Sequence, residues 1–345
     1  MTATHQLQKS QVISVHYMRG FACLIVVLLH YGAYINNLFS FGKFGVDLFF
    51  IISGFIITLT TSKNKSIIHF LRKRFLRIYP IYFIVWLFFC LTLYYNESLS
   101  TILKSLFLLH KDYSQPAPGY GWNMLGPPWT LAYEVVFYFI FALAMKINHR
   151  RRIHVATATI ILAVVGLQYL YNGNFHFNSS ISAHLDVKNP GQAVIKLLST
   201  TILFEFIAGM IIAYNYDKIK TLKPKTYIPL GVLLLIVSFF VFIKYHNTGF
   251  GMDGFFWFTL PLFLGLLLLE PLLIKFQFRA LSFMGDISYT LYLIHFPILL
   301  LYEKHFPTFG MHHYSFLKFL ILIGSSILIS TLLHKYIEKP LMLKK

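Results

Sequence analysis

Long apolar runs separated by short polar stretches dominate this chain. About ten of the runs are long enough to cross a hydrocarbon core as helices, because a span needs roughly 20 mostly apolar residues at a rise of about 1.5 Å each. The predicted spans are 13–31, 44–61, 77–95, 130–147, 154–171, 195–214, 228–243, 255–273, 287–303 and 315–334. The pattern therefore predicts an all-α, polytopic integral membrane protein with one membrane-embedded domain over residues 1–345.

Composition agrees with a bilayer environment. Hydrophobic residues make up 57% of the chain and charged residues only 12%, which is far from the balance of a soluble domain. The first apolar run has no small-residue cleavage site, so we expect a retained helix and not a signal peptide. Cys23 and Cys90 both lie inside apolar runs and indicate neither a disulfide framework nor a metal site.

The basic residues are placed unevenly between the predicted spans. They concentrate at 62–77, 146–153 and 215–226, which fall on the side that both termini share if the number of spans is even. Because Lys and Arg are enriched in cytoplasmic loops, both termini are predicted to be cytoplasmic. The net charge of +18 is then a topology signal plus attraction to anionic lipid headgroups, and it does not indicate nucleic-acid binding.

Ionisable residues inside the predicted spans are the most informative, because a charge in hydrocarbon costs at least about 2.5–3.5 kcal/mol and usually faces a cavity or a partner. Arg19 is expected near the inner face, with His30 about 16 Å further out on the same helix. Asp47 and Glu134 fall near the outer ends of the second and fourth spans. A carboxylate beside His30 would orient its ring as a general base requires. The alternative is structural, with Asp47 as a helix cap and His30 as an interfacial residue.

Two further groups of polar residues fall on helical faces. Arg74 and Arg77 are three positions apart in LRKRFLRIYP (71–80), so with Arg19 they could hold phosphates through guanidinium contacts, unless they only form a basic inner loop. In the ninth span, Ser288, Tyr292 and His295 share one face. His295 would be too deep to reach either interface easily, and it either packs through hydrogen bonds or lines a substrate tunnel. Glu205 is similarly deep, where a buried partner or a protonated state would suffice.

Six segments occur in a characteristic order and spacing: MRGFACLIVVLLHY, FGVDLFFIISGFII, RKRFLRIYP, WTLAYEVVFYF, GDISYTLYLIHFPI and YIEKP. This set resembles the acyltransferase-3 family of polytopic membrane acyltransferases, and it is most similar to the branch that O-acetylates bacterial exopolysaccharide and lipopolysaccharide O-antigen. The resemblance covers nearly the whole chain. It implies a multi-pass protein of the bacterial inner (cytoplasmic) membrane.

The resemblance also implies substrates. Acyl-CoA, most simply acetyl-CoA, would be the cytoplasmic donor and not a permanently bound cofactor, and no metal is expected. The acceptor would be a surface polysaccharide or lipid-linked glycan near the outer face. Some family members carry a soluble hydrolase-like domain after the membrane part, and we expect none here because the chain ends at Lys345. Family motifs fall on Arg19, His30, Gly45, Val46, Asp47, Ser53, Gly54, Phe55, Arg74, Arg77, Pro80, Trp129, Thr130, Leu131 and Glu134.

These inferences combine into one predicted mechanism. The phosphates of acetyl-CoA would lie on Arg19, Arg74 and Arg77, and His30, oriented by Glu134 or Asp47, would take a proton from a sugar hydroxyl. The resulting alkoxide would attack the thioester. A covalent acyl-enzyme on His30 or Ser53 stays open as an alternative. The side chains expected to bind substrate are Ser53, Trp129, Tyr292 and His295.

A transporter or flippase of a lipid-linked or anionic small molecule is the competing hypothesis, because such proteins also need polytopic helices with buried charges. The usual cue for a transporter is a pair of halves with interrupted hydrophobic segments at matching positions. The sequence does not display that pairing.

Overall fold

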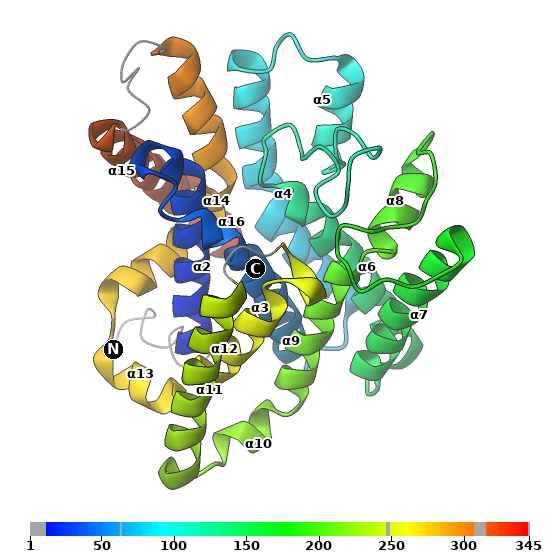
Figure 1. Ribbon diagram of the computed structural model, residues 1–345, viewed down its shortest axis with the longest axis vertical. Coiled ribbons are helices and arrows are strands. Elements are labelled where there is room, and N and C mark those ends of the chain that lie inside the picture. The colour runs from blue at the N-terminus through cyan, green and yellow to red at the C-terminus, as the bar shows by residue number, and fades with distance from the viewer. Residues whose placement is uncertain (1–11, 63, 246–248, 307–314, 344–345) are drawn as a thin grey trace.

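The computed structural model describes residues 12–62, 64–245, 249–306 and 315–343, and the described residues form helices and loops without a strand (Figure 1). Eight helical segments have the length and apolar character of membrane spans. The long helices are α2 (Ile13–Tyr31), α3 (Phe44–Thr60), α4 (Ile67–Thr92), α6 (Trp129–Asn148), α7 (Arg152–Asn172), α11 (Pro224–Tyr245), α14 (Arg279–His305) and α15 (Phe316–Leu333).

Two further spans are broken. The first joins α8 (Pro190–Leu198) to η3 (Thr201–Leu203) and α9 (Phe204–Tyr214) with a bend of 62°, and the second joins α12 (Phe256–Leu268) to α13 (Glu270–Phe276) with a bend of 69°. Counting each pair as one span gives ten among the described residues, so the prediction of about ten spans is confirmed. The predicted continuous helices over 195–214 and 255–273 are instead interrupted.

Each break has a local cause. At the first, side chains satisfy backbone groups that leave the helix: the Gln168 side-chain amide donates to the Ser199 carbonyl at 2.8 Å. At the second, Pro271 lies in the first turn of α13, where its missing N–H and fixed φ suit a helix start better than a helix interior. Two other helices are longer than predicted, since α4 begins at Ile67 and α14 at Arg279.

Helices α2 and α14 approach closely because glycine faces glycine where they meet. A Cβ added to Gly20 would lie 2.6 Å from the Gly285 backbone nitrogen, and one added to Gly285 would lie 2.6 Å from the His16 carbonyl oxygen. Only residues without a side chain allow this approach. The contact fixes the register between the polar residues of α2 and those of α14.

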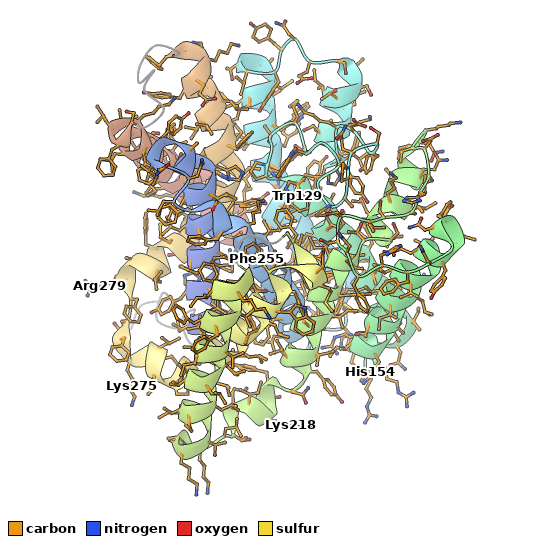
Figure 2. The ribbon with its side chains drawn as sticks, viewed as in Figure 1. Trp129, His154, Lys218, Phe255, Lys275 and Arg279 are labelled. Carbon is orange, nitrogen blue, oxygen red and sulfur yellow. The ribbon has the colours of Figure 1, made fainter. Side chains whose placement is uncertain are left out.

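The two ends of the bundle differ in character. Helix α5 (Leu99–Leu106) and the long connections over 107–128 and 174–189 gather at one end, which we call the loop end (Figure 1). At the opposite end lie α10 (Tyr216–Lys220) and α13, and the cationic side chains of Lys218 and Lys275 project there, whereas Arg279 projects from the side of the bundle (Figure 2). We call this the basic end. Its assignment to the cytoplasm stays a prediction.

Candidate active site

A cavity of about 130 Å³ lies inside the bundle between α2, α3, α4, α6 and α14. Arg19 of α2 and Arg74 and Arg77 of α4 all line it, so the fold brings the predicted cationic set together. We call it the arginine cavity. The other polar side chains that line it are Ser53, Thr130, Glu134, Ser288, Tyr289 and Tyr292.

Neutral groups hold the arginines in place. Arg19 Nη2 donates to Ser288 Oγ at 3.0 Å, and Arg74 Nη2 donates to Thr60 Oγ1 at 3.1 Å. In the part of the chain that the structure describes, no acidic side chain forms an ion pair with any of the three. The cavity therefore keeps an excess of positive charge, which favours an anionic ligand.

Glu134 is the one carboxylate among the described residues that line this cavity. Its Oε1 accepts a hydrogen bond from Ser53 Oγ at 3.1 Å and another from the Tyr138 hydroxyl. Glu134 thus lies beside Ser53 and not beside His30. The predicted pairing of Glu134 with His30 is wrong for this structure, because the side chain emerges on the face of α6 that meets the arginines.

His30 lines a second cavity, of about 350 Å³, at the loop end. We call it the histidine pocket. Its other lining includes Tyr94, Lys111, Trp122 and Phe296. His30 therefore lies at a different level from the arginines, as its position along α2 predicts.

The partner of His30 is a second histidine. His30 Nδ1 lies 2.8 Å from the Val26 carbonyl oxygen and 3.2 Å from Nε2 of His295, and the two rings are 5.0 Å apart between centroids. His295 is fully buried, with its Nδ1 3.1 Å from the Leu291 carbonyl oxygen. The sequence predicted that His295 lies deep in the bundle, but it did not predict the contact between His295 and His30.

These contacts assign the ring protons when both rings are neutral. A carbonyl only accepts, so His295 Nδ1 must donate to Leu291 and His295 Nε2 must be the unprotonated nitrogen. His30 Nδ1 then carries a proton, directed at Val26 and His295. His30 Nε2 is left with its lone pair, which is the arrangement of a general base.

A polar barrier separates the two cavities. The Tyr292 hydroxyl hydrogen-bonds to Thr130 Oγ1 at 2.9 Å and donates to the Pro127 carbonyl at 2.8 Å. Tyr292 and Thr130 line the arginine cavity, whereas Pro127 lines the histidine pocket. The predicted substrate contact of Tyr292 is thus compatible with its place, at the boundary between the two cavities.

Asp47 lies away from both cavities. It is fully buried, and its Oδ1 accepts from the Gly251 backbone N–H at 2.7 Å. The buried carboxyl of Glu205 interacts with it. The predicted orienting contact of Asp47 with His30 is therefore wrong, because Asp47 instead ties α3 to the turn that begins at Gly251. Glu205 is also fully buried, and neither of its carboxyl oxygens has a hydrogen-bond partner among the described residues.

Trp129, which was expected to bind substrate, lies in an aromatic cluster with the loop that precedes it. Trp129 is 1% exposed and lines neither cavity; its ring packs edge-on against Trp122 at 5.9 Å and Tyr133 at 5.9 Å. His110, which was not singled out, is fully buried in the same aromatic cluster, and burial lowers its pKa to about 3. No helical periodicity marks 107–128, so no pattern indicated the burial of His110.

Residues 12–335 match a family model described as an acyltransferase domain, and this range contains every residue that lines either cavity. The chain belongs to the acyltransferase-3 family. The resemblance seen in the sequence is confirmed, and membership supports an acyltransferase enzyme in a multi-pass membrane protein.

Three bacterial relatives carry informative names. The exopolysaccharide production protein ExoZ of Rhizobium meliloti (strain 1021) is 28% identical over 78% of this chain and 80% of its own length. Acyltransferase MdmB of Streptomyces mycarofaciens is 25% identical over 57% of the chain and 55% of its length. O-acetyltransferase OatA of Staphylococcus aureus (strain NCTC 8325 / PS 47) is 24% identical over 94% of the chain.

This acyltransferase-3 chain spans 56% of the length of OatA, so it matches little more than half of that relative and of MdmB. No solved structure matches it.

Proposed function

We propose that this protein is a membrane O-acyltransferase that moves an acyl group, most simply acetyl, from acyl-CoA to a hydroxyl of a glycan. The donor would enter from the basic end, facing the cytoplasm of a bacterium, and the acceptor from the loop end. One observation carries the proposal: α2 presents Arg19 to the arginine cavity and His30 to the histidine pocket, about 16 Å apart by helical rise.

The arginine cavity suits the donor because CoA carries phosphates and the cavity has three cations against one carboxylate. Arg74 also lines a separate hollow of about 110 Å³ toward the basic end, together with Lys73, His69 and Thr60. The two hollows share Arg74, so a nucleotide could lie in one while its pantetheine arm enters the other. An anion is expected to displace the neutral partners that now hold the arginines.

The histidine pocket suits the acceptor. His30 Nε2 would take the proton from a sugar hydroxyl, and the oxygen would attack the thioester carbon, forming the C–O ester bond as the C–S bond breaks. The CoA thiolate then takes the proton from His30. Val26 and His295 both accept from Nδ1–H, so they stabilise the imidazolium that exists between these steps.

Direct transfer requires the Tyr292–Thr130 barrier to open so that the thioester reaches the histidine pocket. A covalent route starts on the other side of the barrier, where Ser53 Oγ already donates to Glu134 and could receive the acyl group. Mixing the enzyme with labelled acetyl-CoA in the absence of acceptor separates the two routes. Label that stays on denatured wild-type protein, and not on Ser53→Ala, would support the covalent route.

A transporter remains the competing function, and the two bent helix pairs are the feature that favours it, since transporters use broken helices. Both pairs, however, occur in the second half of the chain, and neither contributes a residue to the arginine cavity. Binding of CoA decides between the two: an enzyme is thermally stabilised by CoA, and a transporter of another solute is not.

The test of the proposal is ester-linked acetyl on surface polysaccharide, measured by mass spectrometry before and after mild alkali. Cells expressing wild type are compared with cells expressing His30→Ala, and with His154→Ala as a control histidine that projects at the basic end (Figure 2). Alkali-labile acetyl with wild type and His154→Ala, but not with His30→Ala, supports the proposal. Equal acetylation by all three proteins would refute the role of His30.

A further inference from the structure

A third hollow, of about 910 Å³, is distinct from the arginine cavity and the histidine pocket. It lies at the loop end, between α5, the segment 109–114, the segment 184–190 and α8. We call it the outer groove. Its volume is near the upper end of the roughly 300–1,000 Å³ that pockets for drug-sized ligands occupy, so it has room for more than a single sugar ring.

We propose that the outer groove and the histidine pocket form one extended binding site for an oligosaccharide, with Trp122 as the platform for the sugar that is acylated. The proposal rests on the proposed function and deepens it, because it identifies the acceptor as a chain of sugars and not a small isolated molecule.

The two hollows are joined through one residue. Lys111 lines both the outer groove and the histidine pocket. Its backbone N–H donates to the Trp122 carbonyl at 2.8 Å, and the next N–H, of Asp112, donates to the Tyr120 carbonyl at 3.1 Å. These bonds hold the wall of the groove against the segment that carries Trp122, so the two hollows lie next to each other with Lys111 in the wall of both.

Trp122 is an unusual side chain for this position. It is 46% exposed at the mouth of the histidine pocket, although its ring rests edge-on against the buried Trp129. Its φ is +68°, and φ is also positive at Tyr120 (+43°) and Gly121 (+69°). Non-glycine residues in the left-handed region are strained and cluster at functional sites. A flat, rigidly held indole offers an apolar face to the C–H face of a sugar and an N–H to its hydroxyls.

The outer groove itself is polar and pre-arranged. Lys196 Nζ donates to the Tyr113 carbonyl at 2.7 Å, and Lys104 Nζ donates to the Lys111 carbonyl at 3.1 Å. Hydrogen bonds from Ser114 and Gln115 lower the pKa of Asp112, which is therefore ionised at neutral pH.

Cations and carboxylates both line the groove, and His184, Asp186 and Lys188 are exposed there. Cationic hydrogen-bond donors and carboxylate acceptors together suit a hydroxyl-rich chain of sugars better than a lipophilic molecule.

Binding without turnover tests the proposal. Surface polysaccharide from the source cells, stripped of esters by mild alkali, is cut into single sugars and six-unit fragments, and both are titrated into the purified His30→Ala protein by calorimetry. We expect the six-unit fragment to bind at least about tenfold tighter than the single sugar. Trp122→Ala should weaken binding of the six-unit fragment by about tenfold, with Trp122→Phe largely restoring it.

Matched controls separate local from general effects. Trp257→Ala, which removes another exposed tryptophan that lines neither hollow, is the control for Trp122→Ala. Lys218→Ala, which removes a lysine at the basic end, is the control for Lys188→Ala, which removes a lysine of the groove. Equal affinity for short and long fragments, an unchanged affinity in Trp122→Ala, or no binding of either fragment would overturn the proposal. Thermal stabilisation by CoA is measured on the same samples. If CoA does not stabilise the protein but the longer fragment still binds more tightly, the acyl-CoA donor is refuted and the oligosaccharide site in the outer groove is not.

Discussion

Replacing His295 by Phe is the sharpest test of how the two histidines work together. The substitution keeps a buried ring in α14 but removes the acceptor that lies 3.2 Å from His30 Nδ1. Val26 still accepts from the same N–H, so the tautomer of His30 is preserved. On the proposed mechanism, what is lost is part of the stabilisation of the imidazolium that would form when His30 takes the acceptor proton.

The magnitude follows from the hydrogen bond. A bond to a charged group contributes about 1.5–3 kcal/mol, and the 3.2 Å separation places this one in the lower part of that range. A loss of about 1.5–2 kcal/mol in the transition state corresponds to a fall in kcat of roughly 10- to 30-fold. The effect should be smaller than that of His30→Ala, which removes the base itself.

The assay is steady-state release of free thiol from acetyl-CoA by purified enzyme, with the glycan fragments as acceptor. We expect kcat to fall in His295→Phe while KM for the acceptor is unchanged, and His295→Gln, whose amide oxygen can accept, to recover much of the rate. His305→Phe, an exposed histidine at the end of the same helix, is the control. An unchanged kcat in His295→Phe, or a change in KM alone, would refute the assigned role.

Three further substitutions test the helix packing, the donor site and the buried loop. Gly285→Leu should abolish folding, because a Cβ there would lie 2.6 Å from a backbone oxygen of α2, whereas Gly324→Ala, with no atom within 4 Å, should leave the thermal midpoint unchanged in a melting curve. Arg77→Lys should reduce thermal stabilisation by CoA several-fold through loss of bidentate contacts, and an equal reduction in Arg279→Lys would contradict this. Burial lowers the pKa of His110 to about 3 from 6.5, so the unfolded state binds more protons between these values and stability falls as pH drops through that window. His110→Phe should flatten this part of the stability curve, and an unchanged slope in melting curves at pH 4–7 would contradict the assignment.

The features that sequence predicted well are set by local helix geometry. Arg74 and Arg77 are three positions apart, so any helix through them places both side chains on one face. The separation of Arg19 and His30 follows in the same way from the rise per residue. Apolar run length predicted the spans, including the two that proved to be bent, because a bend does not change the composition of a run.

The features that sequence did not predict depend on contacts between distant segments. Asp47 bonds to Gly251, a residue 204 positions away, and no pattern around either one encodes that pairing. The contact between His30 and His295 depends on where α2 and α14 meet, which their facing glycines determine. Trp122 belongs to a loop without periodicity, so its exposure could be read only from the fold.

One face of α14 contributes side chains to the arginine cavity, to the barrier and to the contact with His30. Ser288 holds Arg19, Tyr292 closes the barrier and His295 contacts His30. Because α2 and α14 pack glycine against glycine, the arginine cavity and the histidine pocket are fixed to one stiff pair of helices. Acyl transfer needs the reacting atoms about 3–3.5 Å apart, and a stiff pair cannot bring the cavities together by bending. The movement that the proposed reaction would require is therefore assigned to the side chains of the barrier, and above all to Tyr292, whose hydroxyl would have to leave Thr130 before a thioester could pass.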